Sequence, residues 1–167
     1  MTSLPPPRVA GRYRVAFICS GNICRSPSAD VVLAHQLAQS ALADRVQVVS
    51  GGIGDWHVGN AMDPRSADAL TNRGYDPLRH RAQQVVGSWF ARDDVLFAMD
   101  ETHRQDLVRL GGAERVRLFG DFDPETPGVE VPDPYYGGTD GFEEVLDMVE
   151  RTCSALVPHI ERALSPS

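Results

Sequence analysis

The most regular feature of the chain is an alternation of short apolar runs with longer amphipathic segments. The short runs predict β-strands and span 14–18, 46–50, 94–98 and 115–119. The longer segments have apolar residues at helical spacing and begin at Ser26, Asp63, Glu101 and Asp140. Ser26 and Asp63 each precede a proline, which is typical of an N-cap followed by the first helical residue. Strands that alternate with helices predict an α/β fold with a parallel sheet covered by helices on both faces.

The two ends of this pattern carry separate expectations. Residues 1–12 are rich in proline and lack the apolar stretch of a signal peptide, so we expect a disordered lead before a single domain at 13–165. In the last helix, Asp140 and Glu143 have the spacing of a capping box. Pro158 is expected to kink or shorten that helix.

Composition excludes several classes of function. The formal charge of −7 argues against a nucleic-acid or membrane-surface binder. All sixteen basic residues other than histidine are arginine, which excludes a Schiff-base or P-loop lysine. The five histidines and three cysteines lack metal-site spacing, so no metal and no cofactor is expected. An odd cysteine count and the absence of a membrane-length apolar run predict a reduced, cytoplasmic protein.

The loop after the first predicted strand concentrates the candidate chemistry. Its residues are Cys19, Ser20, Gly21, Asn22, Ile23, Cys24, Arg25 and Ser26. Gly21 and Asn22 tolerate positive φ, so successive backbone N–H groups can turn inward and bind an anion. The helix N-terminus that follows favours a dianion, and Arg25 can hold two phosphate oxygens. Such positive surroundings favour a thiolate at Cys19, which would then be a nucleophile aimed at phosphorus.

A free cysteine at a strand end is more often a buried core thiol than a nucleophile. Here Cys19 and Arg25 flank a Gly-Asn turn between a strand and a capped helix, and that combination favours the nucleophile. The loop lacks the glycine spacing of a dinucleotide site and the Gly-Lys of a Walker loop. Local chemistry alone therefore leads to phosphate or arsenate.

From about Tyr13 onward the sequence resembles the low-molecular-weight protein tyrosine phosphatases, especially their bacterial members. The resemblance rests on Cys-x5-Arg-Ser at Cys19 to Ser26, combined with Asp133-Pro134-Tyr135-Tyr136. It implies a four-stranded parallel sheet and a protein tyrosine phosphatase that acts through a cysteinyl-phosphate. It also implies phosphotyrosine proteins as partners, phosphate or another oxyanion in the site, and a monomer.

The resemblance assigns roles within the loop. Cys19 would be the nucleophile and Arg25 the phosphate clamp, helped by the backbone N–H groups of residues 20–26. Ser26 would hydrogen-bond the Cys19 sulfur, and Asn22 would shape the loop through hydrogen bonds to Ser50 and His80. Cys24 would form a reversible disulfide with Cys19 under oxidant; alternatively, it is a small residue that packs the loop.

Asp133 is the candidate acid. A phenol has a pKa of about 10, so a phenoxide leaves slowly unless an acid protonates it. Pro132 and Pro134 stiffen the loop around Asp133, although most Asp-Pro pairs are plain turns. The following tyrosines and the resemblance single out this one.

The expected mouth of the site is aromatic. Trp56, Tyr135 and Tyr136 would line a slot deep enough for an aryl phosphate, and the alternative for each is ordinary packing on the sheet flank. His57 follows Trp56 and is either a substrate contact or an exposed loop histidine.

Two related activities and one unrelated function compete with this prediction. Thiol-dependent arsenate reductase needs further cysteines for a disulfide relay, and Cys153 falls on an apolar helix face. Protein-arginine phosphatases of this family typically carry Thr where this chain has Ile23. An inactive phosphotyrosine-binding module would not need nucleophile, arginine and acid together.

Overall fold

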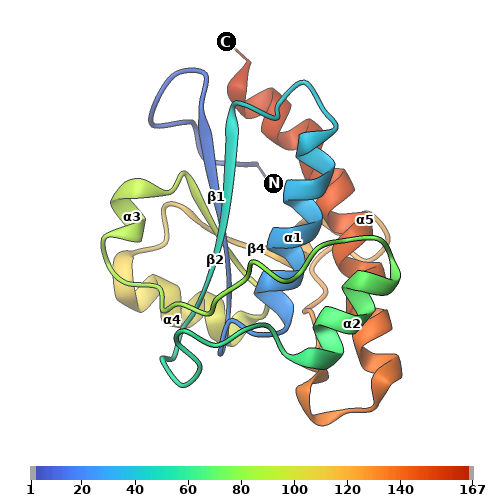
Figure 1. Ribbon diagram of the computed structural model, residues 1–167. Coiled ribbons are helices and arrows are strands. Elements are labelled where there is room, and N and C mark those ends of the chain that lie inside the picture. The colour runs from blue at the N-terminus through green and yellow to red at the C-terminus, as the bar shows by residue number, and fades with distance from the viewer. Residues whose placement is uncertain (1–2, 166–167) are drawn as a thin grey trace.

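The computed structural model describes residues 3–165, with the side chains of Tyr136 and Thr139 outside the described part. Its elements follow the predicted alternation of strands and helices (Figure 1). They are β1 Tyr13–Cys19, α1 Arg25–Ala38, β2 Val46–Gly52, α2 Pro64–Asn72, α3 Trp89–Arg92, β3 Val95–Ala98, α4 Glu101–Gly111, β4 Val116–Leu118, the 3-10 turns η1 Phe119–Phe122 and η2 Pro134–Tyr136, and α5 Thr139–Leu164. The short helix α3 and the two 3-10 turns were not predicted.

The four strands form one parallel sheet in the order β2-β1-β3-β4. Phe17 in β1 pairs with Ser50 on one side and with Phe97 on the other. The chain leaves β1 toward β2 and later returns to β3, so the strand order reverses between β1 and β3. Ligands of open parallel sheets bind at the carboxyl ends of strands at such a point. The loop from Cys19 to Arg25 lies there, and the predicted α/β fold is confirmed.

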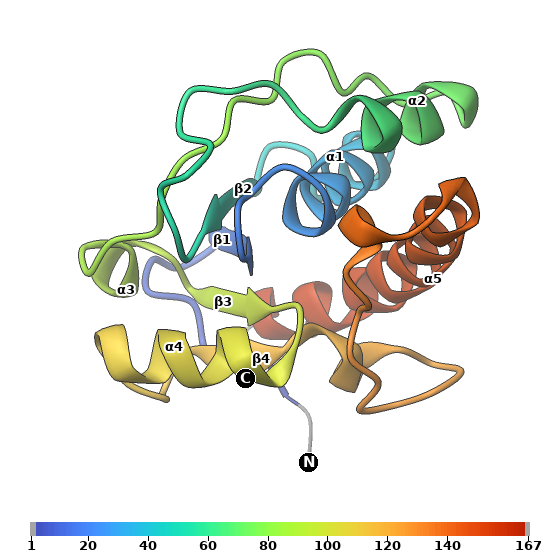
Figure 2. The same cartoon turned by 90° about the horizontal axis from the view of Figure 1, so that it is seen from below.

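Each face of the sheet is covered by its own helices. Val15 and Phe17 point toward α1 and α5 and belong to the larger core cluster. Ala16 and Ile18 point the other way and pack with Trp89 of α3 and with α4. Figures 1 and 2 show α1 and α5 on one side of the sheet and α3 on the other. Side-chain alternation along β1 therefore fixes which helices lie on which face.

The segment 3–12 differs from the expected disordered lead, because it is packed against the sheet. The Tyr13 hydroxyl donates to the carbonyl of Pro5 at 2.8 Å, and the Arg8 N–H donates to Asp94 at 2.8 Å. Pro5, Tyr13 and Asp94 are buried. The proline content suggested disorder, but the buried acceptors at the sheet edge supply partners that hold the segment.

Ser26 does not cap α1 as predicted. The helix begins at Arg25 with Cys24 in the N-cap position, and no side chain caps it. The Ser26 hydroxyl instead reaches back into the loop. The residue that resembled a helix cap is therefore part of the site.

The predicted capping box at Asp140 is also absent, because α5 is preceded by Gly138, which has no side chain to act as a cap. The helix continues through Pro158 to its end at Leu164 rather than stopping there. Leu156 and Ile160 on either side of the proline are fully buried. Their packing holds the last turns despite the missing N–H. Within residues 3–165, no helix is both long and apolar enough to cross a bilayer.

Candidate active site

The loop between β1 and α1 is a tight turn held by its neighbours. Asn22 has a φ of 59°, in the left-handed region that asparagine tolerates better than most residues. Gly52 lets the loop pass close by, since a Cβ at this position would lie 2.9 Å from the carbonyl oxygen of Ser20. The N–H of Ile53 donates to Cys19 O at 2.9 Å. These contacts turn the loop's carbonyls outward, toward the end of β2.

Asn22 fastens the loop from inside, as the resemblance implied. Its side-chain amide donates to Ser26 Oγ at 2.9 Å and to Ser50 Oγ at 3.0 Å. His80 Nε2 donates to the Asn22 carbonyl at 2.6 Å. Burial lowers the pKa of His80, which keeps the ring neutral at pH 7. The N–H of Gln83 donates to Asn22 Oδ1 at 2.9 Å, a partner that the sequence did not predict.

Cys19 and Ser26 face each other at the base of the loop. Cys19 is buried, and its Sγ lies 3.0 Å from Ser26 Oγ. The carbonyl of Gly51 lies 3.3 Å from the same hydroxyl. The single hydroxyl proton therefore has two acceptors in reach, and a thiolate would take it because a charged acceptor forms the stronger hydrogen bond.

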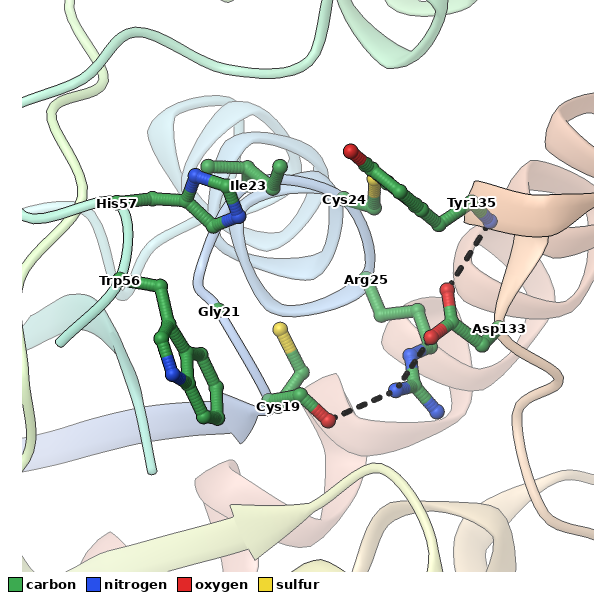
Figure 3. A pocket seen from close by; sticks show the side chains of 10 residues that line it. Cys19, Gly21, Ile23, Cys24, Arg25, Trp56, His57, Asp133 and Tyr135 are labelled. Atoms are coloured by element: carbon green, nitrogen blue, oxygen red, sulfur yellow. Dashed lines mark hydrogen bonds and ion pairs between the residues drawn. The ribbon is translucent and has the colours of Figure 1, made fainter. Parts of the chain in front are cut away.

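Arg25 is only 4% exposed, and four oxygens surround its guanidinium. Nη1 donates to Asp100 Oδ2 at 3.0 Å and to the carbonyl of Val131 at 3.1 Å. Nη2 lies 3.5 Å from Ser20 Oγ. It also lies 3.5 Å from Asp133 Oδ2 (Figure 3). The guanidinium is thus held in one orientation beside the loop, with Asp133 on its open side.

The sequence did not predict the role of Asp100, which follows β3 and caps α4 through the His103 N–H at 3.0 Å. Burial raises its pKa, but that hydrogen bond and the nearby His103 and Arg25 outweigh burial and leave the pKa below its usual value. A carboxylate directly after a strand at the carboxyl edge of the sheet is a signal that could have identified it.

His103 joins Asp100 to Ser20 beneath the loop. Its Nε2 lies 2.8 Å from Ser20 Oγ, and its Nδ1 lies 3.2 Å from Asp100 Oδ1 without hydrogen-bond geometry. Burial and the charge of Arg25 lower the pKa of His103, so the ring is neutral at pH 7. A neutral ring with its proton on Nδ1 accepts the Ser20 hydroxyl proton and turns the Ser20 oxygen lone pairs toward Arg25. The His103 backbone N–H, which donates to Asp100, closes a ring of hydrogen bonds through Asp100, Arg25, Ser20 and His103.

Asp133 stands at the opening, opposite the sulfur. Its side chain is 38% exposed and accepts the N–H of Tyr135 at 3.0 Å. The segment before Asp133 is hydrogen-bonded to the end of β3, because the N–H of Val131 donates to Met99 O at 3.0 Å. A carboxyl group is therefore held at the entrance on a short, anchored loop.

The cavity above Cys19 has a volume of about 440 Å³. Trp56, His57 and Tyr135 line it together with the loop (Figure 3). Trp56 is 70% exposed, which excludes the alternative of packing on the sheet flank. The guanidinium of Arg65 lies 5.3 Å from the Tyr135 ring centre and supports that wall. The predicted rim position of Tyr136 lies outside the described side chains.

The other two cysteines have different surroundings. Cys24 lines the cavity but is buried, and burial raises its pKa to about 12. Cys153 is fully buried in the core, where its Sγ lies 3.8 Å from the carbonyl of Ala29. Both are free thiols. Across residues 3–165, no group of three or more His, Cys, Asp or Glu side chains is arranged to hold a metal ion.

Comparison with known proteins agrees with this geometry. Residues 14–165 match the family described as low molecular weight phosphotyrosine protein phosphatase. The chain is 46% identical to a low molecular weight protein-tyrosine-phosphatase of Streptomyces coelicolor, over 87% of this chain and 92% of that protein. It is 44% identical to low molecular weight protein-tyrosine phosphatase A of Mycobacterium tuberculosis, over 90% of this chain and 93% of that protein.

Solved structures show the same fold. A protein tyrosine phosphatase of Entamoeba histolytica, with Hepes in its active site, superimposes with a TM-score of 0.86 at 33% identity, covering 90% of this chain and 97% of that one. YfkJ of Bacillus subtilis superimposes with a TM-score of 0.87 at 29% identity, covering 95% and 99%. With its family match over residues 14–165 and relatives above 40% identity across most of their length, the chain belongs to the low molecular weight phosphotyrosine protein phosphatase family.

Proposed function

We propose that this chain hydrolyses phosphotyrosine in proteins through a cysteinyl-phosphate intermediate. The observation that carries the proposal is the position of the Cys19 sulfur. It lies at the base of an anion-binding loop, 3.0 Å from the Ser26 hydroxyl, with Arg25 alongside and Asp133 at the opening. The names of the relatives, all phosphotyrosine phosphatases, support the same activity.

In the first step the Cys19 thiolate attacks phosphorus. An electron pair on Sγ forms the S–P bond while the P–O bond to the tyrosine ring breaks. The departing oxygen takes the proton of Asp133, which removes the need to expel a bare phenoxide. Arg25 and the loop N–H groups stabilise the charge on the equatorial oxygens during transfer.

In the second step water attacks the phosphocysteine. Asp133, now a carboxylate, takes a proton from the water while the water oxygen forms a bond to phosphorus. The S–P bond breaks, and its electron pair returns to Cys19, where the Ser26 hydroxyl can donate to it. Inorganic phosphate leaves, and Asp133 is again protonated for the next cycle.

The cavity favours an aromatic phosphate. Its volume of about 440 Å³ lies within the usual range for small-molecule sites, and Trp56 and Tyr135 present rings at its mouth. Arsenate reduction by a relay of thiols is disfavoured, because Cys153, the one cysteine outside the loop, is fully buried among core side chains. Arginine phosphatase activity is disfavoured by Ile23 at the position where that branch carries Thr.

A side-by-side assay tests the assignment. Hydrolysis of an aryl phosphate, hydrolysis of phosphoarginine and reduction of arsenate are measured with the same preparation, and we expect the aryl phosphate to dominate. Cys19→Ser should lose turnover and still bind a phosphotyrosine peptide, whereas the control Cys153→Ala should retain turnover. Full activity in Cys19→Ser, or a preference for phosphoarginine, would show the proposal to be wrong.

We further propose that the enzyme acts in the cytoplasm as a monomer on phosphorylated proteins. Free thiols at Cys19, Cys24 and Cys153 suit a reducing compartment. Light scattering after gel filtration tests the monomer, and a mass twice that of the chain would contradict it.

A further inference from the structure

A second cavity lies at the amino ends of the strands, near the starts of β1 and β2. The catalytic loop lies at the carboxyl ends. The volume of this second cavity is about 370 Å³. Five arginines line it, and we call it the arginine cavity: Arg8, Arg12, Arg14, Arg45 and Arg92. In Figure 1 the starts of β1 and β2 are at the top, whereas β1 ends at the bottom. The cavity is therefore separate from the site that the mechanism uses.

Two of these arginines share one buried carboxylate. Arg14 Nε lies 3.0 Å from Asp93 Oδ1, and Arg92 Nη2 lies 2.9 Å from Asp93 Oδ2. Asp93 is fully buried behind the cavity. The ion pairs with Asp93 therefore give Arg14 and Arg92 a structural role.

Within the described part of the chain, the other three have no carboxylate partner. Arg8 directs its guanidinium at the carbonyls of Phe90 and Asp93, and Arg45 donates to the carbonyl of Gly11 at 3.0 Å. Among the described residues 3–165, no ion pair and no side-chain hydrogen bond involves the guanidinium of Arg12, which is exposed. Each of these guanidiniums has five N–H donors, so most donors remain unused.

The acids of the cavity do not cancel this charge. Asp94 is buried, and its carboxylate accepts the backbone N–H groups of Arg8 at 2.8 Å and of Arg14 at 2.7 Å. Its ion-pair partner is Arg115, whose Nη1 lies 3.8 Å from Asp94 Oδ1. Asp44 is the remaining acid in the lining. Three guanidiniums without a carboxylate partner therefore face one exposed carboxylate, in a chain whose overall charge is −7. The lining of this cavity therefore carries an excess of positive charge.

We propose that the arginine cavity binds a compact polyanion with at least two phosphate groups, of the pyrophosphate class. Guanidinium groups match phosphate oxygens in pairs, and the three open ones come from two separate segments, 8–12 and the start of β2. A volume of about 370 Å³ holds a small molecule rather than a polymer. The overall negative charge repels long polyanions such as nucleic acids, so a short ligand that fits inside the positive region is selected.

Calorimetric titration with pyrophosphate tests the proposal, with saturating phenylphosphonate present to occupy the catalytic loop. We expect one pyrophosphate site whose affinity falls as salt is added. Arg12→Ala combined with Arg45→Ala should weaken binding at least tenfold and leave aryl phosphatase kcat and KM unchanged. Arg79→Ala, which removes an exposed arginine outside the cavity, should bind as the wild type does.

Amide chemical shifts locate the ligand independently. Pyrophosphate should move signals of residues 8–14, 44–47 and 91–94 while the loop at 19–26 is held by phenylphosphonate. Loss of all pyrophosphate binding when phenylphosphonate is present would overturn the proposal, since the only site would then be the catalytic loop. Equal affinity in the double variant and the wild type would overturn it as well.

Discussion

Replacing Asp100 with asparagine isolates the charge that orients Arg25. The aspartate does two things: it accepts Arg25 Nη1 at 3.0 Å, and it caps α4 by accepting the His103 N–H at 3.0 Å. Asparagine has the same shape and is an equally good N-cap, so the helix end is preserved. Asp100→Asn therefore removes the ion pair and leaves the fold in place.

The size of the effect follows from what Arg25 retains. A hydrogen bond to a charged group contributes about 1.5–3 kcal/mol. The Asp100 side chain is 22% exposed, so solvent screening points to the lower half of that range. Arg25 keeps the Val131 carbonyl at 3.1 Å and Asp133 at 3.5 Å. We expect a loss of about 2 kcal/mol in transition-state stabilisation, which is roughly a 30-fold fall in kcat/KM.

Steady-state kinetics on an aryl phosphate measure this loss, with thermal unfolding as a check on the fold. Asp106→Asn is the matched control, because Asp106 lies on the same helix and pairs with the exposed Arg109 outside the site. The control should keep wild-type kinetics. If Asp100→Asn stayed within twofold of the wild type while folding normally, the orientation of Arg25 would not depend on this carboxylate.

The same variant makes a prediction about pH. Because the folded-state pKa of Asp100 lies below its unfolded value of about 3.9, its ionised form stabilises the fold above that pH. This contribution disappears as the pH falls through the folded-state pKa. Chemical unfolding of wild type and Asp100→Asn should thus differ near neutral pH and converge below about pH 4. A difference that grows on acidification would contradict the linkage.

Three further predictions concern other residues of the site. Asp133→Asn should lower kcat strongly for phosphotyrosine and much less for esters with acidic leaving groups, since only the former needs a proton; equal losses would remove Asp133 from the acid role. Peroxide should oxidise Cys19 to a sulfenic acid, which Cys24 then converts to a disulfide with loss of water. Because the Cys24 pKa is raised to about 12, disulfide formation should accelerate with pH, and mass spectrometry finding only over-oxidised Cys19 would contradict the pairing. His103→Gln should lower kcat several-fold and weaken its acid-side pH dependence below about pH 6.5, because a protonated ring cannot accept from Ser20. An unchanged pH profile would show that His103 does not orient Ser20.

The strand pattern predicted the fold class well, because four short apolar strands separated by helices are compatible with few architectures other than a parallel sheet covered by helices. Cys19 and Arg25 could be identified because the whole loop is contiguous in sequence. The position of Asp100 after a predicted strand placed it at the carboxyl end of the sheet but not beside the loop. That proximity, and that of His103, depends on β3 lying beside β1, and the pattern of apolar residues does not determine strand order. Which distant segments lie side by side depends on tertiary packing, and a local sequence pattern carries no information about it.

The predictions for Ser26 as a helix cap and for residues 3–12 as part of a disordered lead were wrong for a related reason. A serine before a proline at the start of a helix resembles a cap, yet the Ser26 hydroxyl lies against the Cys19 sulfur and accepts the Asn22 side-chain amide. Residues 3–12 have the composition of a disordered lead, yet the buried Asp94 accepts from Arg8. In both cases a buried partner from elsewhere in the fold overrides the local preference.

The catalytic centre is assembled from segments that are far apart along the chain, and this has a consequence for folding. Arg25 donates to Val131 across 106 positions of sequence. Contacts of such separation require the closure of long loops and so form slowly compared with helices and adjacent strands. During refolding, β1, α1 and β2 can associate before the loop that carries Asp133 is in place. Recovery of phosphatase activity should therefore lag behind recovery of helical signal, and enzyme turnover becomes a reporter of the last closure step.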